Sequence, residues 1–180
     1  MTTTWHYHRD SAADSLGACH YHLAEMKKAR EYVVAYAHTK ALIFEAKSTL
    51  DSIAAALNGL LELGIIASHV FFNEEFVDRF SRQTRFPSIK EKYPYFITQS
   101  LYDVLVASDR YFPQLRTYLS TMFIFVEADD GTFLLPDSPG VYSLGSGVEA
   151  LHYCNQLLES VKDVFHLFNE LVDDIPRKQG

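Results

Sequence analysis

The chain has little of what several large classes of protein require. Its 180 residues include two cysteines, Cys19 and Cys154, which are too few for a disulfide framework or a four-cysteine zinc site. No uninterrupted apolar stretch approaches the roughly 20 residues that cross a membrane. The eight glycines are scattered, and none belongs to a phosphate-binding loop after a predicted strand.

Positive charge is also scarce. Lysine and arginine total 16 against 23 aspartates and glutamates, for a formal net charge of −7. This balance argues against a general nucleic-acid or anionic-membrane binder, because such proteins are basic. Residues 1–6 have neither the basic start nor the apolar run of a secretory signal. We therefore expect a cytoplasmic protein with buried free thiols and no membrane contact.

Hydrophobic residues make up 48% of the chain, enough for a core in one domain spanning residues 1–180. Their spacing predicts an all-α fold, an up-down bundle of four long helices and a short helix, with a small β-hairpin before the last helix. The expected helices span residues 10–36, 38–63, 73–81, 96–122 and 146–175, the hairpin spans 123–135, and tails occupy 1–9 and 176–180.

Residues at the expected helix ends support these boundaries. Asn73 is suited to cap the short helix, and Gly64 is suited to stop the helix before it in a left-handed conformation. Ser146 and Glu149 have the spacing of a capping box for the last helix. No strong breaker separates the first two helices, which are expected to bend near residue 37.

Two further patterns bear on packing. The last helix carries apolar residues at alternating spacings of three and four along its whole length, and the width of this stripe predicts more than one neighbour. The second helix has a face of small residues that would let another helix approach closely, and Lys47 and Asp51 have the spacing of a surface ion pair. The small-residue face comprises Ser48, Ser52, Ala55, Ala56 and Gly59.

The histidines do not predict a metal site. His20 and His22 are two residues apart, so on a helix they point in nearly opposite directions. Glu149 and Asp163 each precede a histidine by three residues, as in di-iron bundles, but these pairs lie about four turns apart on one helix. We expect no metal and no cofactor, and a metal-dependent helical-bundle enzyme is the third alternative.

One stretch of this acidic protein is basic. Arg79, Arg82, Arg85, Lys90 and Lys92 follow one another within 14 residues and are interleaved with phenylalanines. Arginine neutralises phosphates and aromatic rings stack on bases, so the stretch is a candidate RNA contact. The alternative is a solvated helix face whose phenylalanines lie in the core.

Three segments together resemble the HEPN superfamily, helical domains common in prokaryotic toxins and defence systems. Residues 41–52 resemble the second helix of such proteins. Leu115, Arg116 and Tyr118 fall in a stretch that resembles the start of the family's Arg-to-His motif. The hairpin with residues 135–139 resembles an insertion that some members carry. The resemblance covers most of the chain, although only the Arg-to-His motif is specific.

The resemblance implies a ribonuclease fold without the usual ribonuclease site. Family ribonucleases place a histidine four to six residues after the arginine, at a dimer interface, but none follows Arg116 in that range. No general base for a 2′-hydroxyl is then evident. The resemblance therefore implies a non-catalytic module that homodimerises and binds a protein or RNA partner in a toxin–antitoxin or phage-defence system.

Several surfaces are candidates for these contacts. The homodimer would use the small-residue face of the second helix or the flank of the last. The alternative function is an RNA-processing ribonuclease with a divergent site, in which Arg116 would stabilise the phosphorane. The candidate binding residues are Arg116, Tyr118, Ser120 and Thr121 beside the degenerate motif, and Arg79, Arg82 and Arg85 in the basic stretch.

Overall fold

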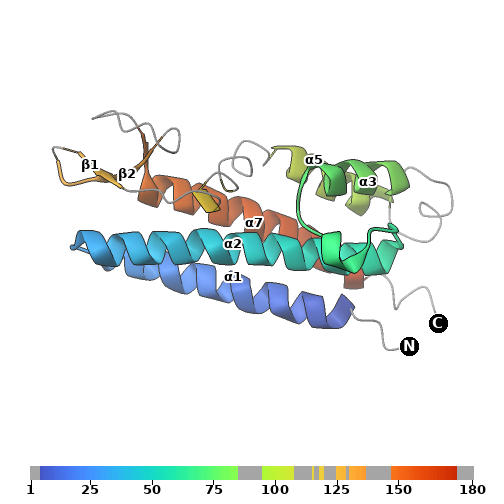
Figure 1. Ribbon diagram of the computed structural model, residues 1–180. Helices are drawn as coiled ribbons and strands as arrows, with labels where there is room; N and C mark the ends of the chain where they lie inside the picture. Colours follow the sequence, from blue (N-terminus) through green and yellow to red (C-terminus); the bar gives the residue numbers. More distant parts are fainter. Residues whose placement is uncertain are drawn as a thin grey trace.

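The computed structural model describes residues 5–84, 95–107, 115, 118–119, 125–128, 130–136 and 147–173. The described chain is mainly helical, which confirms the predicted all-α class (Figure 1). Its helices are α1 (Trp5–Lys28), α2 (Tyr32–Leu61), the short 3-10 helix η1 (Ala67–His69), α3 (Glu74–Thr84), α5 (Tyr95–Ala107) and α7 (Ala150–Asp173), and its strands are β1 (Val126–Glu127), β2 (Phe133–Leu135) and β3 (Val148–Glu149).

Helices α1 and α2 form an antiparallel pair (Figure 1). The Ser15 hydroxyl donates to Ser48 Oγ at 3.1 Å, and the Ser11 and Ser52 hydroxyls lie 3.3 Å apart. The small face of α2 thus admits a close helix neighbour as predicted, and that neighbour is α1 of the same chain. The first helix departs from prediction at both ends, because it starts at Trp5 rather than near residue 10 and stops at Lys28.

The break between α1 and α2 falls at residues 29–31, not at a bend near residue 37. No proline or glycine marks it. Residues on either side of the break meet in antiparallel order, so the packing of α1 against α2 fixes the place of the turn. Residues 5–9, expected in a tail, are helical, and Arg9 donates to Asn169 Oδ1 of α7 at 2.8 Å.

Helix α7 packs against both α1 and α2, as its wide apolar stripe predicts. Its buried face meets the buried faces of the other two helices in one continuous core. Burial of each such large aliphatic or aromatic side chain contributes about 1.5–3 kcal/mol. The most deeply buried large side chains include Leu42, Leu50, Ile53, Leu57, Leu101, Leu115, Tyr153 and Phe168.

Helices α3 and α5 lie together near one end of the bundle (Figure 1). Asn73 caps α3 as predicted, since its Oδ1 accepts the Phe76 N–H at 2.8 Å. Phe76 and Phe80 point into the core. The predicted end of α2 is wrong in detail. The C-cap residue is Glu62 rather than Gly64, and Glu62 adopts a left-handed conformation with φ 53°. Gly64 adopts a left-handed φ of 71° two residues later.

The predicted hairpin is present, and β3 adds a third antiparallel strand that the sequence did not indicate. Gly131 occupies the turn with φ 81°, and its N–H donates to Ala128 O. Glu149 pairs with Leu134 in this sheet, so its assignment to a capping box inside the last helix is wrong. The helix begins at Ala150.

The sheet packs on the start of α2 through aromatic rings. The Phe125 ring lies edge-on to those of Tyr32 and Tyr36 at 5.8 and 5.5 Å, and it stacks with Phe133 at 5.7 Å. Contacts of this kind each add about 0.5–1.5 kcal/mol beyond burial. They hold the sheet at the end of the bundle opposite α3 and α5 (Figure 1).

The third long helix of the prediction is described in part. It starts as α5 at Tyr95, and Leu115, Tyr118 and Leu119 are also helical. Pro113, the expected kink, lies outside the described residues, as does the tail at 176–180. None of the helices in the described part of the chain is both long and apolar enough to cross a membrane.

Candidate functional site

A groove of about 520 Å³ opens on the surface beside the middle of α2. Its floor is made by small and polar side chains of α2. The N-terminal part of α1, the segment around η1, and the helical residue Leu119 form its walls. The lining residues are His8, Phe44, Lys47, Ser48, Asp51, Ser52, Ala55, Ala67, Val70 and Leu119.

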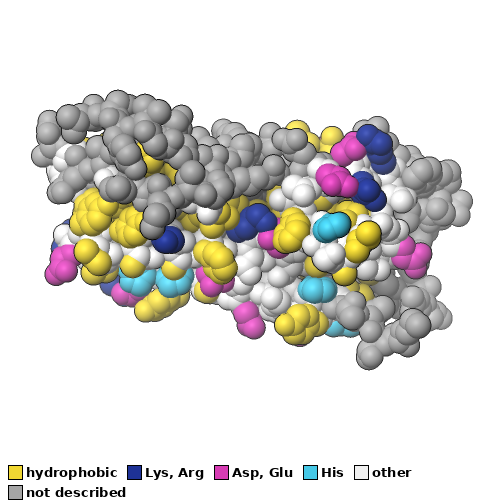
Figure 2. Space-filling model, viewed as in Figure 1, with side chains coloured by type: hydrophobic (Ala, Val, Ile, Leu, Met, Phe, Trp, Pro, Cys, Tyr) yellow, Lys and Arg dark blue, Asp and Glu magenta, His cyan; other side chains and the backbone are white. Residues whose placement is uncertain are grey.

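Large hydrophobic side chains border this groove without being buried. Phe44 is 63% exposed, Phe71 50% and Leu119 36%. Phe71 lies beside the groove because the Lys47 ammonium sits 5.6 Å from its ring centre. Figure 2 shows hydrophobic side chains next to a cationic and an acidic side chain near the middle of this face. Clustered exposed hydrophobic groups around a hollow are typical of a binding surface.

Lys47 and Asp51 form the predicted ion pair, and this pair also contributes to tertiary structure. Both side chains are largely buried, and the Asp51 carboxylate also accepts the Phe72 N–H at 2.7 Å. The pair thereby ties the segment after η1 to α2. Removing either side chain would leave a partly buried charge without its partner, which is costly. The two side chains therefore stay paired, and the Asp51 carboxylate keeps this segment against the groove.

The degenerate motif contributes differently from what the resemblance implies. Tyr118 is 5% exposed, its hydroxyl donates to Pro136 O at 3.1 Å, and its ring lies edge-on to Tyr153. The phenol is thus committed to the core, while the next residue, Leu119, reaches the groove. Arg116, Ser120 and Thr121 lie outside the described residues.

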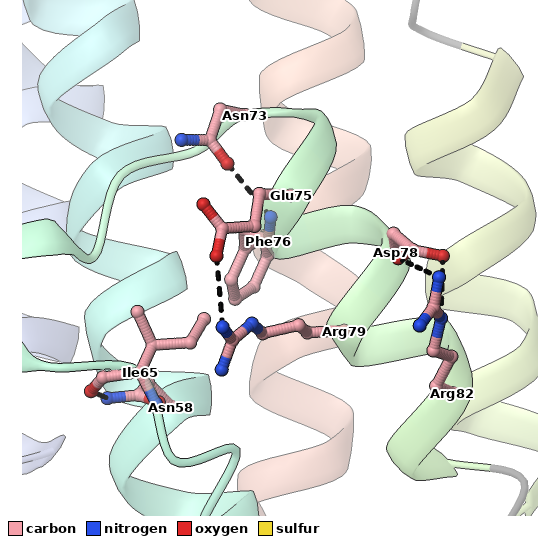
Figure 3. Close-up of polar contacts among 8 residues, drawn as sticks. All are labelled: Asn58, Ile65, Asn73, Glu75, Phe76, Asp78, Arg79 and Arg82. Atoms are coloured by element: carbon pink, nitrogen blue, oxygen red, sulfur yellow. Dashed lines mark hydrogen bonds and ion pairs between the residues drawn. The ribbon is translucent and has the colours of Figure 1, made fainter.

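Two arginines of the basic stretch, Arg79 and Arg82, are paired within α3 (Figure 3). Arg79 Nη2 lies 3.1 Å from Glu75, and the Arg82 guanidinium binds the Asp78 carboxylate at 3.0 and 2.7 Å. Helix α3 has three acidic and two basic residues, so its own net charge is −1. It is not a positive surface, and Arg85 lies outside the described residues.

The loop before α3 is held by Asn58 of α2. The Asn58 side chain donates to Ile65 O at 2.9 Å and accepts the Ile65 N–H at 3.0 Å (Figure 3). This paired contact fixes the chain just before η1. The wall formed by the segment around η1 is therefore held by hydrogen bonds at both Asn58 and Asp51.

A histidine pair joins α1 to α2 away from the groove. His22 Nδ1 and His38 Nδ1 lie 3.0 Å apart, with ring centres 5.3 Å apart. Partial burial and the neighbouring His38 lower the pKa of His22, although Glu45 opposes the shift. Figure 2 shows histidine side chains at separate places on this face. The pair is a hydrogen bond between one donor and one acceptor nitrogen.

No catalytic thiol or metal cluster emerges in the described ranges. Burial raises the pKa of Cys19 to about 12, and it raises the pKa of Cys154 still further. Such thiols are poor nucleophiles at neutral pH. In that same part of the chain, no three histidine, cysteine, aspartate or glutamate side chains lie close enough to hold one metal ion.

Sequence reasoning missed the groove and the histidine pair. It compared His22 with His20 on the same helix, whereas its partner is His38 on the next helix. An antiparallel turn near residue 30 would have placed 22 opposite 38, but no breaker signals that turn. The groove had a weaker signal, an unexplained phenylalanine, Phe44, on the side of α2 that faces away from its apolar stripe.

Comparison of the chain with protein-family models, curated proteins and solved structures found no match.

Proposed function

We propose that this chain is a non-catalytic HEPN-like helical module that homodimerises and binds a partner through its surface. The observation that carries the proposal is the groove on α2, where Phe44 and Leu119 line a hollow and remain exposed, and the exposed Phe71 contacts the lining residue Lys47. Covering a phenylalanine side chain that is now in water is favourable by about 1.5–3 kcal/mol. A second protein surface that fills the groove would gain this energy.

Chemistry supports binding rather than catalysis. The stretch after Arg116 contains no histidine in the range that the resemblance requires, and both thiols are buried. A toxin–antitoxin or phage-defence setting, which the resemblance implies, is part of the same proposal.

Charge favours protein over RNA as the partner. The chain carries a net charge of −7, and Arg79 and Arg82 each pair with a carboxylate of their own helix. An RNA-binding surface gains its affinity from cations that are free to neutralise phosphates. The mixed, partly apolar groove is better matched to a protein surface.

The oligomeric state tests the homodimer directly. Sedimentation equilibrium over a hundredfold range of concentration should show a reversible monomer–dimer equilibrium. A chain that stays monomeric at every concentration would contradict the homodimer. Light scattering coupled to size exclusion provides an independent mass.

A further inference from the structure

We propose that the groove receives the α2 helix of a second copy of this chain, with the two helices antiparallel across a two-fold axis near residue 49. The proposal rests on the homodimer of the proposed function and adds the surface and the geometry. It follows from a self-complementary arrangement of large, small and charged side chains along one helix.

The projecting side chain, Phe44, and the hollow that would receive its counterpart lie on the same helix, α2. Phe44 projects from α2 with 63% of its surface exposed, and Ala55 lies three turns further along in the floor of the groove. Ala67 and Val70 flank that floor. When two copies of α2 cross antiparallel, Phe44 of each copy reaches the hollow near Ala55 of the other.

The charges agree with the same axis. The midpoint between Lys47 and Asp51 is residue 49, and the midpoint between Phe44 and Ala55 lies between 49 and 50. A two-fold axis there places Lys47 of one copy opposite Asp51 of the other, twice. Charge complementarity and the fit of Phe44 therefore select one register, as a self-complementary interface requires.

A parallel arrangement fails on the same residues. It would place Lys47 opposite Lys47 and Asp51 opposite Asp51, and like charges held together in a partly buried site are destabilising. It would also bring the two Phe44 rings together and leave both hollows empty. The geometry thus distinguishes the two ways in which α2 could pair with itself.

Cysteine cross-linking tests the register. Ser48→Cys is made together with Ser15→Ala, which removes the α1 hydroxyl that donates to Ser48 Oγ. In this variant the two new thiols lie about 3 Å apart along the helix direction, whereas in Val33→Cys they lie about 48 Å apart, given a rise of 1.5 Å per residue. We expect a disulfide-linked dimer with Ser48→Cys and none with Val33→Cys. The native cysteines are buried and do not compete.

A second pair of variants tests the energetics without any cross-link. Phe44→Ser should raise the dimer dissociation constant at least tenfold in sedimentation equilibrium. Val33→Ser is the matched control, because Val33 lies on the same helix with 71% exposure and outside the groove. It should leave the dissociation constant unchanged, and circular dichroism should show both variants folded.

The outcomes separate this inference from the proposed function. A dimer that persists in Phe44→Ser and does not cross-link through Ser48→Cys would overturn the groove interface while leaving the homodimer intact. A cross-link through Val33→Cys would overturn the antiparallel register. A wild-type chain that is always monomeric would overturn both proposals.

Discussion

His22 of α1 and His38 of α2 face each other with their Nδ1 atoms 3.0 Å apart. One imidazole donates and the other accepts, so the bond exists only while at least one Nδ1 is unprotonated. With ring centres 5.3 Å apart, two imidazolium cations would repel each other. The pair therefore links α1 to α2 through a contact that depends on protonation.

This contact should make stability depend on pH. The pKa of His22 is lowered in the folded protein, so the unfolded chain binds the proton more readily. The stabilisation is complete above the unfolded pKa of about 6.5 and is lost as the pH falls through the lower folded pKa. Urea unfolding between pH 7.5 and 5 should show decreasing stability.

Two variants distinguish the contribution of the His22–His38 pair to this pH dependence from that of other nearby groups. Glu25 and Glu45 act electrostatically on the histidines, and Tyr21 lies edge-on to both rings. Replacing His38 with glutamine removes the neighbouring imidazole that, after burial, lowers the pKa of His22, so His38→Gln should reduce the pH dependence below about 6.5. His20→Gln, on the exposed side of α1, should keep the wild-type slope; equal slopes in both variants would refute the role of the pair.

Asp51 should be the most sensitive charged residue near the groove. Asp51→Ala removes the partner of Lys47 and the acceptor of the Phe72 N–H, and it should lower the free energy of unfolding by about 2 kcal/mol. Asp51→Asn keeps an acceptor oxygen and should cost less. Glu75→Ala, which breaks the exposed pair with Arg79, should stay within about 0.5 kcal/mol. Equal losses for Asp51→Ala and Glu75→Ala in chemical denaturation would contradict this ranking.

Two glycines should respond in opposite ways to alanine. At Gly147, with φ 153°, an added Cβ would lie 2.5 Å from Leu135 O, so Gly147→Ala should destabilise by about 2 kcal/mol. At Gly59, inside α2, nothing lies within 4 Å of the new Cβ, and Gly59→Ala should stabilise by about 0.5 kcal/mol. Thermal unfolding of both variants measures the contrast, and a stabilised Gly147→Ala would show that β3 does not pack as described.

RNA binding should be weak. A fluorescent single-stranded RNA should show no saturable anisotropy change at about 0.15 M salt, because α3 has no net positive charge. Binding that falls steeply with salt and is lost in the double variant Arg79→Ala, Arg82→Ala would instead identify RNA as the partner. Lys162→Ala is the control, since Lys162 pairs with Glu159 on α7.

Local signals in the sequence were sufficient for most helices. The apolar spacing in α2 and α7 matches their buried faces because a helix buries the same side every three to four residues. The start of α3 was predicted from Asn73 for a similarly local reason, because the Asn73 side chain accepts the N–H of the residue three positions later. The capping-box prediction for Glu149 was wrong because the same residue spacing also occurs at a strand, and Glu149 pairs with Leu134 in the sheet.

The sequence by itself determined an acidic, all-α chain with amphipathic helices, since composition and periodicity act within a few turns of one helix. Only the tertiary structure decided where α1 ends, which histidine meets His22, that Tyr118 is buried, and that Phe44 borders a groove. Each of these depends on residues far apart in the chain brought together by packing, and no local pattern specifies the partner that a side chain will meet.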